Sequence, residues 1–194
     1  MKSVYQLEMN HDYAIKLDRI KEGEKISFVS DTMFEVMLNH EYRIKYASFL
    51  IRHILGLEVK SIKLKKPMLD KENVYKKGRR VDFVCEIENK VINIEMNNNP
   101  SFATVIRNFK YATDLFQQEV KRGEDYRKEE MVIQINFNNF SYGENCPVEE
   151  TFRMMSDQRE NSLLENFQIV NIYLPEIRRK YYNEGEITEV EKCC

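Results

Sequence analysis

Several acids and amides lie within one short apolar stretch of the chain, VDFVCEIENKVINIEMNNNP, which spans residues 81–100, and three of them could do chemistry together. Asp82 is in its first half, and Glu95 and Asn97 are in its second half. Both halves are apolar enough to be strands of a core, where an uncompensated charge is costly to bury. Two carboxylates that approach each other repel unless a proton or a cation lies between them. Because carboxylate oxygens suit hard divalent ions, the pattern points to Mg²⁺ or Mn²⁺.

Alternation of apolar and polar side chains predicts that this stretch is a β-hairpin, and its loop decides how the acids meet. If the loop is 89–90, Asp82 lies opposite Asn97 and is a diagonal neighbour of Glu95. If the loop is 88–89, Asp82 and Glu95 lie directly opposite each other. A three-residue loop without a bulge places the acids on different faces. On a solvated face, both acids are ordinary surface charge.

The rest of the chain reads as helices and strands that flank this hairpin, which predicts an α/β fold with a mixed β-sheet flanked by helices. The helix expected over 101–123 has an apolar stripe made of Val105, Phe109, Ala112, Phe116 and Val120. The expected order is a helix that begins at Ser30 or Asp31, a helix over 42–55 that Gly56 ends, a strand in 57–66, the hairpin strands 80–88 and 91–97, the helix over 101–123, a strand over 131–140, a helical segment over 149–158 and a strand over 167–174.

The amino-acid composition limits the classes of protein to which this chain can belong. The 194 residues are 42 % hydrophobic, which suffices for one sizeable core. The 30 basic and 32 acidic residues nearly cancel, so net charge neither favours nor excludes a polyanionic partner. Four cysteines without a CxxC spacing favour a reducing, cytoplasmic location, and we expect neither membrane association nor a small-molecule cofactor. We expect a flexible arm at 1–27, one folded domain at 28–182 and an acidic tail at 183–194.

A basic segment precedes the hairpin. Between residues 59 and 80 the chain has nine basic residues and two acidic ones. Such a run can follow a DNA backbone with salt-sensitive, sequence-independent affinity, although a charge run is more often a solvated face. We expect DNA contacts from its last four basic residues, Lys76, Lys77, Arg79 and Arg80.

The spacing D82-(12 residues)-E95-M96-N97 resembles the motif of the PD-(D/E)xK nuclease superfamily. More narrowly, the chain resembles the PD-(D/E)xK nuclease family transposases, which are related to the recombination-promoting nucleases. The landmarks run in order from about residue 31 to residue 177: SDTMF, RRVDFVCEIENKVINIEMN, RNFKYATDLF, GEDYRKEEMVIQINF and FQIVNIYLPEI. The resemblance implies a restriction-endonuclease-like core.

The resemblance also implies a role for each residue of the motif. Asp82 takes the place of the first aspartate, and Glu95 takes the place of the second acid. Met96 contributes a main-chain carbonyl that can face the metal. Asp31 falls where such nucleases often carry a further acidic ligand. Asn97 stands where the superfamily has lysine, and its amide offers a donor and an acceptor with which to orient the attacking water.

Two residues of the following helix, Arg107 and Tyr111, border the site by resemblance, and their spacing of four places them on one helix face. Arg107 could contact phosphate, and both residues are expected to contact DNA. On helix geometry alone, a salt bridge and a partly buried ring are equally good readings of the pair.

Three functions follow from these readings. The first is a Mg²⁺- or Mn²⁺-dependent DNA endonuclease of mobile-element or recombination processes, which would need a homodimer to cut both strands. The second is a nuclease fold that has lost catalysis through Asn97 and binds nucleic acid or a protein; here Asn97→Lys or Asn97→Gln would create or raise cleavage. The third is an interaction domain in which Asp82 and Glu95 share no face.

Overall fold

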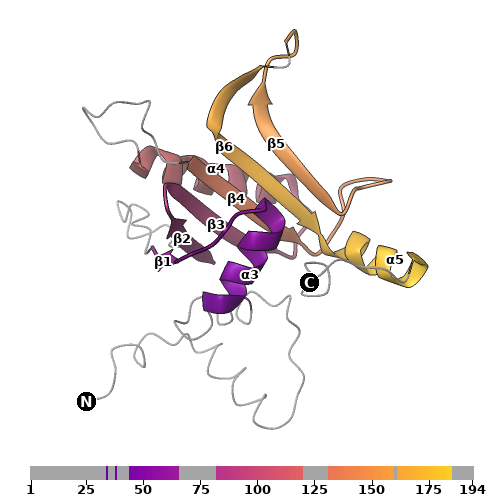
Figure 1. The fold of residues 1–194 in the computed structure, drawn as a ribbon. Helices are drawn as coiled ribbons and strands as arrows, with labels where there is room; N and C mark the ends of the chain where they lie inside the picture. The colour runs from indigo at the N-terminus through magenta and orange to yellow at the C-terminus, as the bar shows by residue number, and fades with distance from the viewer. Residues whose placement is uncertain are drawn as a thin grey trace, which may run out of the picture.

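A six-stranded mixed sheet with helices on both faces forms the body of the protein (Figure 1). The computed structural model describes residues 34, 38, 44–65, 82–119, 131–159 and 161–184. Within these ranges the strand order is β1-β2-β3-β4-β6-β5. This arrangement confirms the α/β class and the mixed sheet flanked by helices.

The sheet joins an antiparallel part to a parallel part. Strands β1, β2 and β3 pair antiparallel, β3, β4 and β6 pair parallel, and β5 returns antiparallel to β6. The described elements are α3 (Ile44–Leu55), β1 (Lys63–Leu64), β2 (Phe83–Ile87), β3 (Lys90–Asn97), α4 (Phe102–Glu119), β4 (Met131–Asn138), β5 (Glu149–Met155), β6 (Ser162–Tyr173) and α5 (Leu174–Glu184).

Helix α3 covers one face of the sheet and helix α4 covers the other (Figure 1). The α3 face is apolar along its whole length, since alternate residues of β2, β3, β4 and β6 are buried hydrophobic side chains. Helix α3 contributes Ala47, Leu50, Ile51 and Ile54 to this core. Gly56, with a φ of +64°, follows the last residue of α3, as predicted for a glycine that ends a helix.

The α4 face changes from apolar to polar along the strands. At one end Val91 of β3 and Val132 of β4 lie side by side and pack in a cluster with Ala112 and Leu115 of α4. Towards the carboxyl ends of β3 and β4 the same face carries only polar side chains, in three neighbouring pairs. These pairs are Asn93 with Gln134, Glu95 with Asn136, and Asn97 with Asn138. All six side chains are buried.

Helix α4 begins within the range expected for it, but part of its expected apolar stripe is wrong. Val105 and Phe109 are exposed, whereas Ala112 is buried and Phe116 is partly buried. The amino-terminal half of α4 instead buries Thr104 and Asn108, together with Tyr111. The reason is the polar end of the sheet beneath it, which accepts polar side chains from the helix. Val120 lies outside the described residues.

Residues 149–158 are not helical, which corrects the expectation for that segment. Strand β5 occupies Glu149–Met155 and pairs with β6, which starts five residues earlier than its expected bound at 167. The exposed side chains of Phe152, Met154 and Met155 explain the misreading, because an edge strand with both faces open shows no clear alternation. In residues 57–65, the described part of the strand expected at 57–66, only Lys63–Leu64 forms a strand. Helix α5, for which no element was expected, runs two residues into the expected tail.

Several expectations fall outside the described ranges. These are the arm at 1–27, most of the first helix, residues 66–80 of the basic segment with its four expected DNA contacts, and the tail after residue 184. Phe34 and Leu38 are described, and both are helical and fully buried in the core beneath α3. In the described ranges, no helix combines the length and apolarity that a membrane span needs.

Candidate active site

The loop of the β2–β3 hairpin consists of Glu88 and Asn89, which is the second of the two registers considered from the sequence. Phe83 pairs with Ile94, so the next position outward sets Asp82 against Glu95. Both acids are on the α4 face, since Val84 of the same face packs against α4. The two carboxylates therefore come from adjacent strands and share one face.

Backbone N–H groups of the facing strand segment bind the carboxylates of Asp82 and Glu95. The backbone N–H of Asp82 donates to Oε1 of Glu95 at 3.3 Å, and the backbone N–H of Met96 donates to Oδ2 of Asp82 at 2.8 Å. Nδ2 of Asn93 also donates to Oε1 of Glu95 at 3.2 Å. One oxygen of each carboxylate is thus fixed by N–H donors.

Burial favours the protonated, neutral form of the Glu95 carboxyl group. Its side chain is 3 % exposed, and desolvation, followed by the negative charge of Asp82, raises its pKa from 4.5 to about 8. The hydrogen bonds from Asn93 and from the Asp82 backbone, and the positive charge of Arg107, work in the opposite direction. The site therefore favours either a proton or a cation next to Glu95.

Asn97 connects the hairpin to helix α4. Its Oδ1 accepts a hydrogen bond from a guanidinium nitrogen of Arg107 at 2.8 Å, and its Nδ2 donates to Oδ1 of Asn138 at 3.0 Å. The Asn97 side chain is 1 % exposed, whereas Arg107 is exposed. Both ends of the Asn97 amide are engaged, so it holds the Arg107 guanidinium beside the two acids. Nδ2 of Asn138 is buried and has no hydrogen-bond partner.

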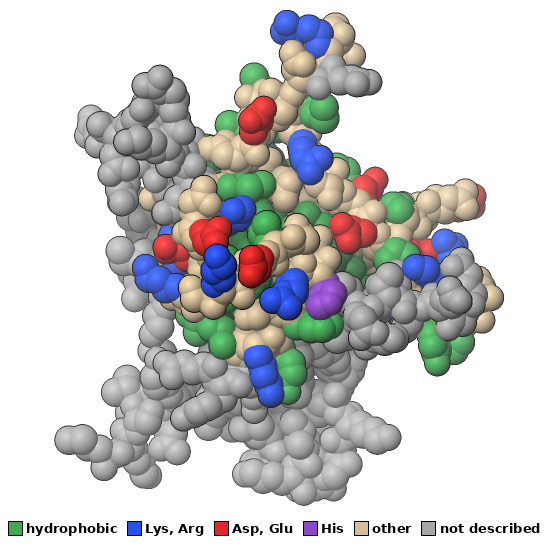
Figure 2. Space-filling model, in the orientation of Figure 1, with side chains coloured by type: hydrophobic (Ala, Val, Ile, Leu, Met, Phe, Trp, Pro, Cys, Tyr) green, Lys and Arg blue, Asp and Glu red, His purple; other side chains and the backbone are tan. Residues whose placement is uncertain are grey.

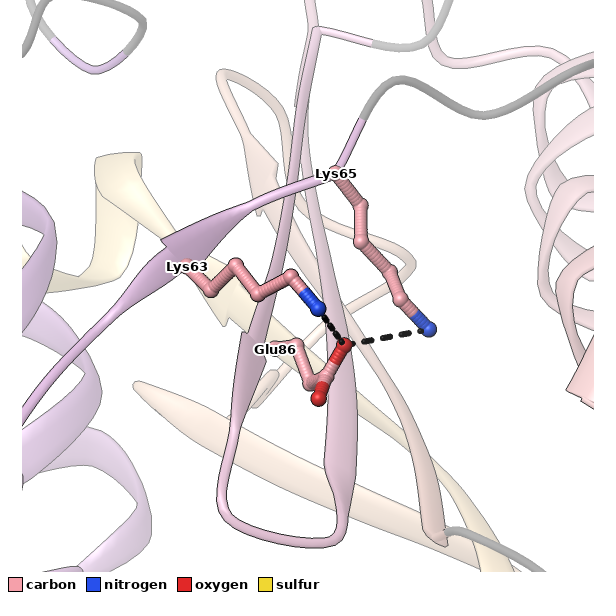
Figure 3. A network of polar contacts seen from close by, with 3 residues as sticks. All are labelled: Lys63, Lys65 and Glu86. Carbon is pink, nitrogen blue, oxygen red and sulfur yellow. Dashed lines mark hydrogen bonds and ion pairs between the residues drawn. The ribbon is translucent and has the colours of Figure 1, made fainter.

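A third acid of the same strand face is in a different electrostatic state. Glu86 of β2 forms ion pairs at 3.5 Å with both Lys63 and Lys65 of the segment that contains β1 (Figure 3). Two ammonium groups thus lie beside the Glu86 carboxylate and compensate its charge. Asp82 and Glu95 face each other, and Glu86 faces lysines, which separates a candidate metal-binding pair from an ordinary surface ion pair.

The structure brings together five of the residues that the sequence singled out: Asp82, Glu95, Met96, Asn97 and Arg107. Tyr111 lies one turn after Arg107 on α4 and is buried. Asp31 and the basic residues Lys76, Lys77, Arg79 and Arg80 lie outside the described ranges. On the face of the described residues that Figure 2 shows, basic and acidic side chains are interspersed, so that face presents a mixed surface rather than a single-sign field.

The polar neighbours of the acids were not found from the sequence. Asn93, Gln134, Asn136 and Asn138 are all buried beside or near Glu95 and Asn97. Their signal was present, because in VINIEMN and VIQINFN every second residue is polar within a strand that is otherwise apolar. A strand with one polar face reads as half-exposed, and only the sheet register with α4 above it reveals that these amides are buried.

The donor set suits a hard divalent cation. Asp82 and Glu95 offer carboxylate oxygens, and because burial and the charge of Asp82 raise the pKa of Glu95, a bound cation would compensate the charge of the pair. Within the described ranges no group of three or more His, Cys, Asp or Glu side chains could hold a metal ion. The described residues therefore supply two candidate ligands, both carboxylates. Waters, a main-chain carbonyl or a further residue would complete the coordination shell of the cation.

The comparisons with known proteins give one match. No curated protein and no solved structure matches this chain. A family model described as PD-(D/E)XK nuclease family transposase matches residues 29–192, which contain the hairpin acids, α4 and the whole described sheet.

Proposed function

This chain belongs to the PD-(D/E)XK nuclease family transposases, and we propose that it is a metal-dependent endonuclease that hydrolyses phosphodiester bonds of DNA in mobile-element or recombination processes. Membership of a nuclease family makes a nuclease-type function the premise. The endonuclease activity and its dependence on Mg²⁺ or Mn²⁺ are the proposal.

The observation that carries the proposal is the pairing of Asp82 with Glu95. The two acids come from adjacent strands and share the face under α4, and the backbone N–H groups of Asp82 and Met96 each fix one carboxylate oxygen of the pair. A pair of facing carboxylates in a buried setting costs stability unless a cation compensates it. Two facing carboxylates in a member of a nuclease family are what a metal site requires.

In the proposed mechanism Asp82 and Glu95 would hold a divalent cation, and the main-chain carbonyl of Met96 and the carboxylate of Asp31 would be further ligands. When bound, such a cation polarises the phosphodiester and lowers the pKa of a water molecule. The protein's own contribution is to orient these ligands and to place positive charge at the phosphate. Here the geometry supports a division of labour in which Asn97 holds Arg107 and Arg107 contacts the phosphate.

Arg107 therefore supplies the positive charge that the motif's lysine would bring. The sequence suggested that Asn97 orients the attacking water directly, but its Oδ1 is engaged by Arg107 and its Nδ2 donates to Asn138. An asparagine that is 1 % exposed acts more readily through a partner than on solvent. We propose that the exposed guanidinium contacts the DNA and that Asn97 positions it.

The test is cleavage of supercoiled plasmid at low salt with Mg²⁺ or Mn²⁺. Wild type should nick or linearise the plasmid, and Asp82→Ala and Glu95→Ala should each abolish cleavage. Glu86→Gln is the matched control, because it removes an acid of the same strand face that is paired with lysines. Cleavage that survives both alanine variants, or that Glu86→Gln abolishes equally, would refute the assignment of the site.

Linearisation in a single binding event would require two active sites. In that case we expect a homodimer, which sedimentation equilibrium with and without DNA would detect. A protein that only nicks the plasmid need not associate.

The alternative is a lapsed nuclease that binds nucleic acid without cutting it. The observation that favours it is Asn97, since an amide takes the place of the motif's lysine. Calorimetric titration with Mn²⁺ separates the two functions. A lapsed nuclease that keeps its metal site would bind plasmid without cleaving it, even at Mn²⁺ concentrations that saturate the protein. A lapsed nuclease that has lost its metal site would show no Mn²⁺ binding in the titration.

A further inference from the structure

A row of buried amides leads across the sheet to Glu95. Nδ2 of Asn93 donates to Oε1 of Gln134 at 2.7 Å, Nε2 of Gln134 donates to Oδ1 of Asn136 at 2.8 Å, and Nδ2 of Asn136 donates to Oδ1 of Asn171 at 2.9 Å. The row continues from Asn171 to the hydroxyl of Tyr173, which donates to Glu150 of β5. It thus crosses β3, β4 and β6 and ends on the edge strand.

Every amide of the row has a defined orientation. Each carbonyl oxygen from Gln134 to Asn171 accepts from the preceding amide, and each of these NH₂ groups donates to the following residue. At the near end, the NH₂ group of Asn93 donates in two directions, to Gln134 and to Oε1 of Glu95. Turning this amide over would place Oδ1 of Asn93 against a carboxylate oxygen, which electrostatic repulsion opposes.

The fold itself does not need these amides. One step along the same face, Val91 and Val132 fill the equivalent positions on β3 and β4 and pack against α4. Asn93 and Gln134 are both fully buried, and Oδ1 of Asn93 has no hydrogen-bond partner. A buried acceptor without a partner costs free energy, so apolar side chains would stabilise the sheet better at this place. The amides must therefore serve the group to which they donate.

We propose that Asn93 and Gln134 are positioning residues for Glu95. Gln134 fixes the orientation of the Asn93 amide, and Asn93 fixes Oε1 of Glu95, which leaves Oε2 to the divalent cation. This inference rests on the proposed function for the identity of the cation. It adds two residues of the described sheet that the nuclease motif does not contain.

The test measures Mn²⁺ affinity of the full chain by calorimetry for wild type, Asn93→Leu and Gln134→Leu. Loss of a group that orients a metal ligand typically weakens metal binding about 10- to 100-fold, and we expect a loss of that size for both variants. Each substitution leaves a buried polar partner without its hydrogen bond, so the melting temperature of the metal-free variants should fall moderately while the variants stay folded. Asn171→Leu is the matched control, since it removes an amide from the far half of the row. Its Mn²⁺ affinity should stay within about twofold of wild type, because the two residues nearest Glu95 keep their contacts.

Two results would overturn the inference: wild-type affinity in both Asn93→Leu and Gln134→Leu, or an equal loss in Asn171→Leu. If wild type binds no Mn²⁺, the proposed function fails, and a second measurement decides the inference alone. In metal-free, ¹⁵N-labelled protein the Asn93 side-chain NH₂ protons should exchange slowly with solvent, and Glu95→Ala and Gln134→Leu should each speed that exchange. Exchange that neither substitution changes would show that Asn93 does not hold Glu95.

Discussion

Glu95 is a residue whose ionisation depends strongly on its surroundings. It is buried, it faces Asp82, and its pKa is raised to about 8. In the metal-free protein this acid therefore keeps its proton in the folded state at a pH at which the unfolded chain has lost it. The folded state binds more protons than the unfolded state between the ordinary value of 4.5 and about 8. Its contribution to stability is thus present at low pH and lost as pH rises through that window.

Glu95→Gln should remove this pH dependence. The free energy of unfolding of the variant should exceed that of wild type in EDTA, by a margin that grows with pH and reaches on the order of 2 kcal/mol above about pH 8. The measurement is urea denaturation in EDTA at about pH 5 and about pH 8.5. A margin that is equal at both pH values would contradict the raised pKa. Addition of Mg²⁺ should stabilise wild type and leave Glu95→Gln unchanged.

A second test at the residue scale moves the positive charge from position 107 to position 97. Arg107→Gln should lower the cleavage rate about 10²- to 10³-fold, as expected for loss of a group that stabilises charge in the transition state. Asn97→Lys alone should lower the melting temperature without raising cleavage, because it places a second cation beside the Arg107 guanidinium. The double variant Asn97→Lys/Arg107→Gln should recover cleavage relative to Arg107→Gln.

One result of these substitutions would contradict the assignment of the phosphate contact to Arg107. If Asn97→Lys alone raises cleavage while Arg107→Gln has no effect, Asn97 contacts the reacting groups itself and Arg107 is only a surface charge. Metal affinity should be measured for all three variants, so that a change in cleavage is not mistaken for a change in metal binding.

At the scale of elements, the hairpin was the part that the sequence predicted best, since its alternation restricted the loop to two positions that keep Asp82 and Glu95 on one face. The chain alone could not choose between them. The choice of Glu88 and Asn89 places Glu88 at a φ of +54°, a left-handed conformation that a glutamate adopts at a cost. Nothing in the composition of ENK marks this position.

Glu88→Asn should therefore stabilise the protein, by about 0.5 kcal/mol, because asparagine tolerates a positive φ better than glutamate. Glu88→Val should destabilise it by more than about 1 kcal/mol, since a β-branched residue is strained there. Urea denaturation measures both. Neither substitution touches the site, so metal affinity is the internal control. Equal stability of the two variants would mean that the loop has shifted.

Elements whose character depends on their neighbours were predicted less well. Strand β5 owes its conformation to pairing with β6, and its exposed apolar side chains resemble a helix stripe when read alone. The buried side of α4 follows the polar end of the sheet rather than the apolar stripe in its own sequence. For the same reason Asn93 and Gln134 escaped notice, because their importance arises from burial under α4 and not from their spacing.

At the scale of the whole molecule, the described sheet has a buried centre and, at the β5 edge, a part that is only two strands wide. Strands β3 and β4 have neighbours on both sides, whereas residues 162–166 of β6 pair only with β5. This two-stranded extension projects from the body beyond the rest of the sheet (Figure 1). Its side chains Met154, Met155 and Leu163 are exposed, and an isolated pair of strands is marginally stable in water.

Hydrogen exchange should divide the sheet accordingly. Backbone amides of 153–155 and 162–165 should exchange at least about 10²-fold faster than those of 132–137, because opening the extension does not disturb the core. Mass spectrometry of peptides from these segments measures the difference. Uniform protection along β6 would show that the extension is held by something besides β5, such as a second copy of the chain.

The distances along the chain between the partners of the site set the order in which it can assemble. Asp82 and Glu95 are 13 positions apart and meet as soon as the hairpin closes, whereas Asn93 and Gln134 are 41 apart and meet only when the parallel strands dock. Long loops must close before such contacts form, which makes parallel pairing a late event in folding. The two carboxylates are thus neighbours before their amides arrive. Their repulsion therefore raises the free-energy barrier to folding. Divalent cations or mild acid should speed refolding and also stabilise the folded protein.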